Sequence, residues 1–266
     1  MAHEVLLTAR ELRKSFPAST GAFTHSAQQH AAVDGVSFEL ERGKTLGIVG
    51  ESGCGKTTLA RVLLRLIEPD SGEIEFGGHN WLQARGDELR GMRRRMQMVF
   101  QDPVASLNPR MRVGTIVGEP LEIHEPRLSS AECRERAEQI LEAVGLAADA
   151  LNRYPHEFSG GQRQRIGIAR ALILRPELVI ADEPVSALDV SIGAQILELL
   201  ARLREEFSLT MILISHSLPV VAQLASRVAV MQAGKFVETG AAEQVLSAPQ
   251  HPYTKSLLAA VPEIPA

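Results

Sequence analysis

The sequence predicts an α/β fold with a parallel sheet at its core. Three apolar runs of strand length, TLGIVG (45–50), LVIADE (178–183) and TMILIS (210–215), each lead into polar residues. Because they lack alternation, they indicate strands that are buried on both faces, as in parallel sheets covered by helices. The alternating segments VDGVSFEL (33–40) and GEIEFGG (72–78) predict antiparallel strands in addition to that core.

Three further segments lie outside the core strands. EVLLTAREL (4–12) predicts a first strand, and the small, polar stretch 17–32 predicts a surface loop. Within that stretch, His25 and His30 are five apart, which suits neither one helical face nor a compact metal site. Near the end, VAVMQAGKFVETG (228–240) predicts a hairpin that turns at Ala233-Gly234.

Two stretches predict helices in addition to those that follow the glycine-containing motifs described below. Residues 102–158 resemble an inserted helical subdomain, in which Ser129 and Glu132 form a capping box and Gly145 is a helix stop. Residues 192–207 predict an amphipathic helix. Its apolar face consists of Ile192, Ile196, Leu199, Leu203 and Phe207.

The composition is typical of a globular protein. The chain has 266 residues, of which 45% are hydrophobic and 23% charged. The net charge of −4 gives no support for a nucleic-acid partner. The densest basic patch, Arg93-Arg94-Arg95, is predicted to be a solvated face, and a contact with phosphate or an acidic partner is the alternative.

The sequence shows no pattern that indicates disulfides, a signal peptide or a transmembrane helix. Two cysteines, Cys54 and Cys133, make no disulfide framework and fit a reducing compartment. The N-terminal segment lacks the apolar region of a signal peptide, and no apolar run approaches the ~20 residues of a transmembrane helix. Any association with a membrane is therefore expected to run through a protein partner.

The segment GESGCGKT (50–57) matches the phosphate-loop pattern G-x-x-x-x-G-K-[ST] between a predicted strand and a predicted helix. Its glycines allow backbone N–H groups to point at phosphate oxygens, and Lys56 adds a positive charge. A glycine-rich turn with a chance lysine is the alternative, but the full motif in this context favours nucleotide binding. The residues expected to contact the nucleotide here are Gly50, Glu51, Ser52, Gly53, Cys54, Gly55, Lys56, Thr57 and Thr58.

A pair of carboxylates follows the second apolar run. Asp182 is placed at a strand end to hold the Mg²⁺ shell through water, together with the Thr57 hydroxyl. Glu183 projects in a different direction and can polarise the attacking water. Two solvated acidic residues are the alternative, which the phosphate loop at the end of another core strand makes less favoured.

A second glycine-containing turn, FSGGQRQ (158–164), precedes a basic helical stretch. A helix N-terminus of this kind suits an anion, but the turn has no lysine.

The order of these motifs resembles the ATP-binding subunit of an ABC transporter. Residues 50–58 match its Walker A loop, LVIADE its Walker B motif, and FSGGQ its signature, with Phe158 where leucine is common. Further matches are Gln101 of the Q-loop in MVFQDP, Asp189 of the D-loop SALD (186–189), the switch His216 in LISHS, and Phe16 as the aromatic that stacks on adenine.

The resemblance implies a P-loop ABC ATPase core with an antiparallel β subdomain and an inserted helical subdomain, all in one domain over 1–266. It implies Glu183 as the base, His216 at the γ-phosphate, and Gln101 both as a Mg²⁺ ligand and as the link to the permease.

The resemblance also explains the missing lysine. Two ATPase domains would pair head to tail, and each ATP would lie between the Walker A loop of one and the signature of the other. The residues acting on the partner's ATP would be Ser159, Gly160, Gly161 and Gln162. Glycine would be required because a side chain would collide with ATP in the facing loop.

Three stretches resemble the oligopeptide, dipeptide and nickel uptake branch: 96–111, 153–172 and the tail HPYTKSLLAAVP (251–262) within 249–266. The tail would also fit a plain amphipathic helix. This branch implies two permease subunits, a second related ATPase or a copy of itself, and an extracytoplasmic binding protein. It also implies ATP and Mg²⁺ as cofactors and a peripheral location on the cytoplasmic face of the cell membrane, without nucleic acid.

Two other classes are weaker. A soluble ABC ATPase of DNA repair or the ribosome usually shows a long coiled-coil insertion or tandem ATPase units, and this chain shows neither. A P-loop kinase or small GTPase leaves FSGGQ and His216 unexplained. Three positions depart from the common pattern: Thr57 replaces serine, Ser217 replaces an aspartate, and Gly193 stands where glutamine is more frequent.

Overall fold

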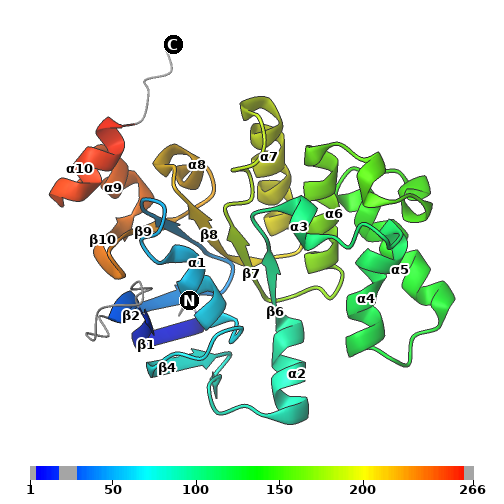
Figure 1. The fold of residues 1–266 in the computed structure, drawn as a ribbon, viewed down its shortest axis with the longest axis horizontal. Coiled ribbons are helices and arrows are strands. Elements are labelled where there is room, and N and C mark those ends of the chain that lie inside the picture. Colours follow the sequence, from blue (N-terminus) through cyan, green and yellow to red (C-terminus); the bar gives the residue numbers. More distant parts are fainter. Residues whose placement is uncertain (1–3, 18–28, 261–266) are drawn as a thin grey trace, which may run out of the picture. The chain divides into compact units, whose positions relative to one another are not determined.

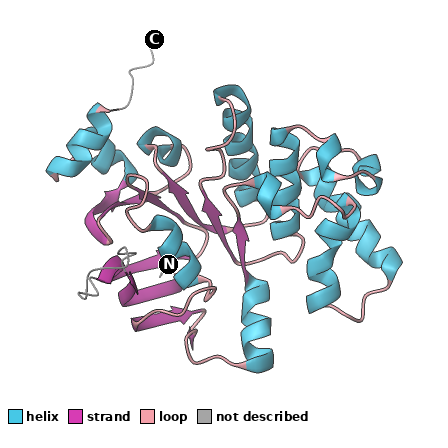
Figure 2. Ribbon diagram, in the orientation of Figure 1, coloured by secondary structure: helices cyan, strands magenta, loops and turns pink. Residues whose placement is uncertain are grey.

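The computed structural model describes residues 4–17 and 29–260 (Figure 1). The chain divides into two compact units. Unit 1 comprises Met1–Ala84 and Leu213–Ala266, and unit 2 comprises Arg85–Ile212. Both units combine helices with strands (Figure 2). The expected α/β class is confirmed.

Unit 1 contains an antiparallel sheet in the order β2-β1-β4-β5. Its strands are β1 (Val5–Pro17), β2 (Gln29–Glu41), β4 (Ser71–Phe76) and β5 (His79–Asn80). The strands predicted at 4–12, 33–40 and 72–78 are confirmed.

The strand β2 begins earlier than expected, inside the stretch 17–32 that was predicted as a loop. Ala31 pairs with Ser15 and His30 with Phe16, so the far end of β1 supplies ladder partners that local sequence does not reveal. The rest of the predicted loop, residues 18–28 with His25, lies outside the described residues.

A second sheet in unit 1 carries β3 (Thr45–Val49), which is buried along its whole length. It pairs in parallel with β9 (Arg227–Gln232), and β9 pairs antiparallel with β10 (Lys235–Ala241). The connecting residues Ala233 and Gly234 have φ values of 45° and 82°, which fits the primed turns of tight hairpins. The hairpin expected at this dipeptide is confirmed.

The described residues of unit 1 contain four helices: α1 (Lys56–Leu63), α8 (Leu218–Ala222), α9 (Ala242–Ser247) and α10 (Pro252–Ala259). The end of α1 is fixed by Trp81, which is fully buried and whose Nε1–H donates to the Leu63 carbonyl over 2.6 Å. Helix α8 packs so closely on β3 that a Cβ on Gly47 would lie 1.9 Å from Val221 Cγ1.

Unit 2 contains the parallel pair β6 (Met96–Val99) and β7 (Leu178–Asp182). The strand β8 (Thr210–Ser215) neighbours β7, and its last part, from Leu213, belongs to unit 1, where it neighbours β3. Every residue of β7 and β8 is buried, as the continuous apolar runs predicted.

Helices make up most of unit 2. They are α2 (Gly86–Arg95), α3 (Pro103–Ser106), α4 (Val113–His124), α5 (Ser130–Ala143), η1 (Ala148–Asn152), η2 (Pro155–Glu157), α6 (Gly160–Leu172) and α7 (Val190–Glu206). The stretch 102–158 is helical as expected. Ser129 Oγ accepts the Glu132 N–H over 3.3 Å and the Glu132 carboxylate accepts the Ser129 N–H over 2.8 Å, so the capping box is confirmed. Gly145, with φ 78°, follows the end of α5.

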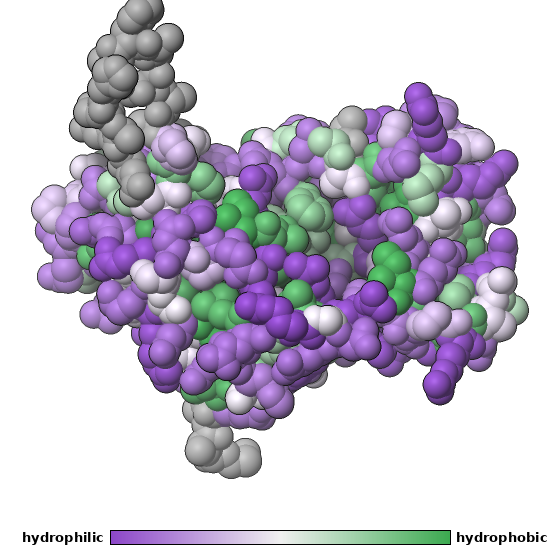
Figure 3. Space-filling model, turned by 60° about the horizontal axis from the view of Figure 1, so that its bottom comes forward, coloured by the Kyte–Doolittle hydropathy of each residue, from purple (hydrophilic) through white to green (hydrophobic). Residues whose placement is uncertain are grey.

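The surface in Figure 3 is mostly hydrophilic, with hydrophobic side chains in small separate groups. Among the helices of the described ranges, none has the length and apolar character needed to cross a bilayer.

Candidate functional site

The predicted phosphate loop connects β3 directly to α1 in unit 1. Gly53 and Gly55 have φ values of 82° and 113°, a backbone region that other residues rarely adopt. A Cβ on Gly55 would lie 1.9 Å from the carbonyl oxygen of Ala32, and a Cβ on Gly50 would lie 2.1 Å from that of Met231. Glycine is therefore required at positions 50 and 55 by the packing of the loop against neighbouring backbone, whether or not a nucleotide is bound.

The Lys56 side chain lies against this loop and is 4% exposed. Its Nζ donates to the carbonyl oxygens of Gly50 and Glu51, over 2.8 Å in each case. The exposed residues Glu51, Ser52 and Gly53 form the outer part of the loop. A buried ammonium inside a loop whose outer residues are exposed is suited to bind an anion.

Cys54 is buried beside this ammonium, with its Sγ 3.9 Å from Lys56 Nζ. Burial raises the pKa of the Cys54 thiol above its ordinary value, although the Lys56 charge acts in the opposite direction. The thiol is therefore neutral at physiological pH. Thr57 and Thr58 follow in the first turn of α1, both partly exposed.

Two other predicted residues of unit 1 are exposed. His216 lies between β8 and α8, and Phe16 lies near the end of β1 at 37% exposure, with Lys14 Nζ 5.7 Å from its ring centroid.

Ser217 is the N-cap of α8 but makes no side-chain capping hydrogen bond. Its N–H instead donates to Ser215 Oγ over 3.0 Å, so the cap that an aspartate would provide is absent here.

In unit 2 the structure brings Gln101 and Glu183 together. Gln101 follows β6 and Glu183 follows β7, and since these strands are parallel neighbours, both residues lie at the carboxyl edge of the pair. Gln101 Nε2 donates to Glu183 Oε2 over 3.2 Å. Glu183 has φ 46°, a strained conformation for a residue with a side chain, and Asp182 before it is 2% exposed.

The segment after Glu183 ties it to helix α7. Ser186 Oγ donates to the Glu183 carbonyl over 3.1 Å, and Asp189 caps α7 by accepting the Ile192 N–H over 2.9 Å. The predicted D-loop aspartate is therefore a helix cap in this chain.

The signature turn is the start of helix α6. Ser159 is its N-cap: Ser159 Oγ accepts the Gln162 N–H over 3.3 Å, and Gln162 Oε1 accepts the Ser159 N–H over 3.0 Å. The N–H groups of Gly160 and Gly161 occupy the first turn, where helix N–H groups have no partner within the helix. Phe158 is 4% exposed, with the Arg153 guanidinium 4.4 Å from its ring centroid.

The two signature glycines differ in what surrounds them. A Cβ on Gly161 would lie 2.4 Å from Ile192 Cγ2 of α7, whereas a Cβ on Gly160 would make only a 3.4 Å contact with Leu188. The expectation that both are required by a facing ATP is therefore incomplete, because packing within unit 2 already requires glycine at 161.

The residues predicted to bind Mg²⁺ offer suitable donors. Thr57, Gln101 and Asp182 supply hydroxyl, amide and carboxylate oxygens, the ligand class that Mg²⁺ prefers, usually together with substrate phosphates. In the described part of the chain, no group of three or more His, Cys, Asp or Glu side chains could hold a metal by itself. Thr57 belongs to unit 1, whereas Gln101 and Asp182 belong to unit 2, and in each unit the donors are of the oxygen type that suits Mg²⁺.

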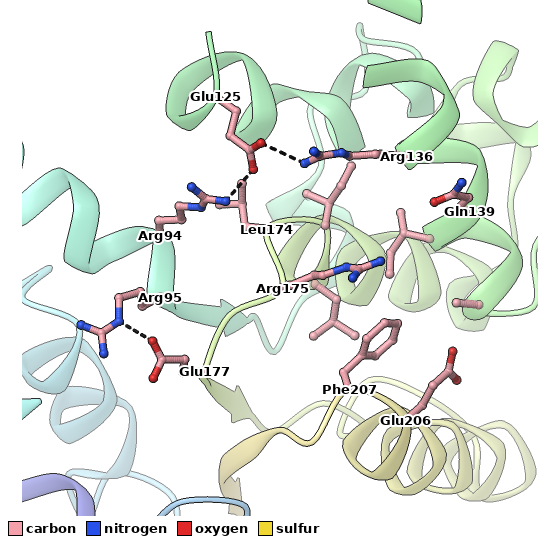
Figure 4. Close-up of a pocket in the computed structure, with 14 residues that line it drawn as sticks. Arg94, Arg95, Glu125, Arg136, Gln139, Leu174, Arg175, Glu177, Glu206 and Phe207 are labelled. Atoms are coloured by element: carbon pink, nitrogen blue, oxygen red, sulfur yellow. Dashed lines mark hydrogen bonds and ion pairs between the residues drawn. The ribbon is translucent and has the colours of Figure 1, made fainter. Parts of the chain in front are cut away.

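In the basic patch Arg93-Arg94-Arg95, which was predicted to be a solvated face, Arg94 and Arg95 form ion pairs. Arg94 pairs with Glu125 over 2.7 Å, and Arg95 pairs with Glu177 (Figure 4). These residues line a cavity of about 680 Å³, which also adjoins the C-terminal end of α6, opposite to the signature. The predicted ATP residues do not line this cavity.

One contact of the phosphate loop was missed from the sequence. The Glu51 N–H donates to the Tyr253 hydroxyl over 3.0 Å, so the C-terminal helix α10 reaches the loop. The tail sequence indicated only a lineage or an amphipathic helix, and the 202 positions between the two residues leave no local signal.

Known proteins confirm the resemblance. The ABC transporter family matches residues 33–186, more than half of the chain, and the family of the oligopeptide/dipeptide transporter C-terminal region matches residues 237–266. The dipeptide transport ATP-binding protein DppF of Haemophilus influenzae is 52% identical over 259 residues, which cover 97% of this chain and 79% of that protein. The oligopeptide transport ATP-binding protein OppF of Escherichia coli is 50% identical, with coverages of 97% and 78%.

Solved structures agree with these relatives. The ATP-binding cassette MJ0796, in a dimeric post-hydrolysis state bound to ADP and Pi, matches with a TM-score of 0.78 and 28% identity, covering 89% of this chain and 99% of that one. The cassette CbiO1 of Clostridium perfringens, part of a transporter complex, matches with a TM-score of 0.77 and 25% identity, with 92% of each chain covered. The chain therefore belongs to the ABC transporter family, in which it is an ATP-binding subunit that hydrolyses ATP.

Proposed function

We propose that this subunit powers the uptake of dipeptides or oligopeptides by an ABC importer. The proposal is supported by the names of the relatives, which are peptide transport proteins, and by the match of the tail to the oligopeptide/dipeptide C-terminal region. Nickel, the other cargo expected for this branch, lacks comparable support.

The observation that carries the proposal is the phosphate loop with its buried ammonium. Lys56 donates to two carbonyl oxygens of the loop, a geometry that a phosphate can replace with a stronger charge-assisted contact. We assign the loop residues 50–58 to the phosphates of ATP and Phe16 to its adenine ring.

The remaining roles follow the chemistry of each side chain. Thr57, Gln101 and Asp182 would hold Mg²⁺, Asp182 through water, and the ion would supply charge neutralisation at the phosphates. Glu183 accepts a proton from the attacking water, and His216 donates to the γ-phosphate. Because Gln101 already contacts Glu183, a movement of the Q-loop would change the position of the base.

The signature acts in trans in this proposal. Ser159 and the N–H groups of Gly160 and Gly161 contact ATP held by the Walker A loop of a partner ATPase, and Gln162 fixes the turn. The positive end of α6 favours this contact. The partner is a related ATPase subunit or a second copy of this chain.

The assembly completes the proposal. Two permease subunits bind the ATPase pair at the cytoplasmic face of the membrane, so the chain is peripheral. A binding protein outside the cell membrane delivers the peptide. The Q-loop and the helical segment 102–158 are the surfaces assigned to the permeases.

Purification of the native complex from membranes tests this function. Permease subunits should co-purify with the chain, and the reconstituted complex should hydrolyse ATP faster when peptide-loaded binding protein is added. The Lys56→Ala subunit should assemble normally but lose this response. Co-purification with ribosomes or nucleic acid would contradict the proposal, and stimulation by nickel in place of peptide would change the cargo.

A further inference from the structure

The structure connects the C-terminal helix of unit 1 to the loop that binds ATP. The contact is the hydrogen bond from the Glu51 N–H to the Tyr253 hydroxyl, 3.0 Å long. Glu51 is the second residue of the phosphate loop, and Tyr253 lies in the first turn of α10. We propose that Tyr253 is a positioning residue for ATP binding, which sets the conformation of the phosphate loop through this hydrogen bond.

Tyr253 is itself held firmly in place. The Glu238 carboxylate on β10 accepts the N–H groups of Gln250 over 2.7 Å and of His251 over 3.0 Å. His251 caps α10 by accepting the Tyr253 N–H over 3.2 Å, and Thr254 is fully buried. The start of α10 is therefore attached to the same sheet that carries the loop.

That sheet also fixes the other end of the contact. β10 pairs with β9, β9 pairs in parallel with β3, and β3 leads directly into the phosphate loop. The turn between β9 and β10 contacts the loop as well, because the Gly234 N–H donates to the Cys54 carbonyl over 2.9 Å. The sheet therefore fixes the position at which the Tyr253 hydroxyl contacts the phosphate loop.

The Glu51 residue is held from both of its backbone groups. Its N–H donates to Tyr253, while its carbonyl oxygen accepts from Lys56 over 2.8 Å. A change in the orientation of Glu51 would therefore move one of the two acceptors that hold the ammonium. Since a phosphate loop works by directing selected N–H groups towards the anion, fixing the Glu51 N–H on the Tyr253 hydroxyl helps to define the orientation of the others.

The phenol suits this role chemically. A tyrosine hydroxyl can accept a hydrogen bond when neutral, and burial raises the pKa of Tyr253, so it stays neutral at physiological pH. Tyr253 is partly buried, so water competes less well for the Glu51 N–H than at a fully exposed position.

A purely structural role for Tyr253 makes a different prediction. If the residue only anchored the tail, its ring would do so by packing, and the loss of the hydroxyl would change stability without changing nucleotide affinity. The substitution Tyr253→Phe separates these roles, because it keeps the ring and removes the hydroxyl.

The experiment compares Tyr253→Phe with the wild-type full chain. We expect the Kd for Mg·ATP to rise about three- to tenfold, the range that one hydrogen bond accounts for, while kcat at saturating ATP stays within about twofold. Hydrogen exchange at the Glu51 amide should accelerate in the variant, since its acceptor is lost.

A matched control removes a second hydroxyl from the same helix. Ser256 is exposed, and its Oγ donates to the Pro252 carbonyl, so Ser256→Ala should leave the Kd for Mg·ATP unchanged. An unchanged Kd in Tyr253→Phe, or an equal rise in both variants, would overturn the inference.

The inference rests on the proposed role of the phosphate loop, and Lys56→Ala distinguishes the two. If Lys56→Ala binds Mg·ATP as tightly as the wild type, the proposed ATP site itself is wrong. If Lys56→Ala loses binding and Tyr253→Phe does not, only the role of Tyr253 fails.

Discussion

The phosphate loop and the signature turn both lead into a helix, but they use glycine in opposite ways. In the phosphate loop, Gly53 and Gly55 take positive φ values and the backbone curls around the Lys56 ammonium. In the signature turn, neither Gly160 nor Gly161 has a positive φ, and the turn is closed by the side chains of its own capping box.

The difference indicates two modes of anion contact. A curled loop with a buried cation can surround a phosphate from several sides. A capped helix start offers only a few N–H groups along its axis and can therefore meet a phosphate that is held elsewhere. The comparison supports a division of labour in which the first turn binds ATP and the second completes a site on another subunit.

The largest expected effect is on the rate of ATP hydrolysis. It concerns Glu183, which lies outside both turns and is the proposed base. Glu183→Gln should lower kcat for ATP hydrolysis by about 10²- to 10⁴-fold while the chain still binds ATP. Glutamine keeps the shape of the side chain, so the strained backbone at position 183 is unaffected. Steady-state hydrolysis and nucleotide titration measure the two quantities.

A suitable control is Glu198→Gln, which changes an exposed glutamate on α7 and should leave both quantities unaltered. Near-normal turnover of the Glu183 variant in the assembled transporter would show that another group acts as the base.

The second prediction tests the division between the two turns. Gly160→Asp places a carboxylate where the partner's γ-phosphate would lie, and like charges in contact cost several kcal/mol, so ATP-driven pairing should weaken about a hundredfold or more. The monomer should bind ATP normally, because its own phosphate loop is unchanged. Gel filtration with ATP and titration of the monomer give the two readouts.

Nucleotide trapping with each subunit's Walker A lysine disabled in turn locates the damage. If Gly160→Asp impaired the site that contains Lys56 of the same chain and spared the partner's, the composite site would be refuted.

The third prediction concerns Cys54 in the curled loop. A thiol reagent should block ATP binding by its bulk, whereas Cys54→Ser should remain active. ATP at 100 times its Kd should slow labelling about a hundredfold if the bound form is unreactive. The thiolate is the reactive form and burial raises the Cys54 pKa, so labelling should accelerate as the pH increases.

Cys133, which is partly exposed on α5, provides an internal reference whose labelling should not respond to ATP. Equal labelling of Cys54 with and without saturating Mg·ATP would argue against the assigned position of the nucleotide.

The smallest effects distinguish glycines that packing requires from those it does not. Gly161→Ala should lower the free energy of unfolding by about 1–3 kcal/mol because of the close contact with Ile192. Gly193→Ala should raise it by about 0.5–1 kcal/mol, since a Cβ there would lie 3.5 Å from Val185, an ordinary contact, within a helix. Urea denaturation measures both changes; destabilisation by the Gly193 variant would mean that this glycine is needed for a different reason.

Features set by neighbouring residues could be predicted from the sequence. The capping box of Ser129 and Glu132, the turn at Ala233-Gly234 and the buried run before Asp182 each depend on a few consecutive positions. The placement of candidate groups at strand and helix ends followed from the same patterns.

Features set by distant residues could not be predicted. The extension of β2 to Gln29 depends on pairing with β1, and the requirement for glycine at 161 depends on Ile192 of another helix. The contact of Tyr253 with the phosphate loop depends on the sheet that positions α10 beside the loop. Hydrophobic periodicity describes local structure and does not predict which distant segments come into contact.

The position of Trp81 has a practical consequence. It is the only tryptophan in the chain, it is fully buried, and its indole N–H is bonded to the last turn of the helix that begins at Lys56. The tryptophan fluorescence of the protein therefore comes from a single indole attached to the helix behind the phosphate loop. If nucleotide binding shifts that helix, the emission of the unlabelled protein will change with it, which provides an optical signal without an introduced dye.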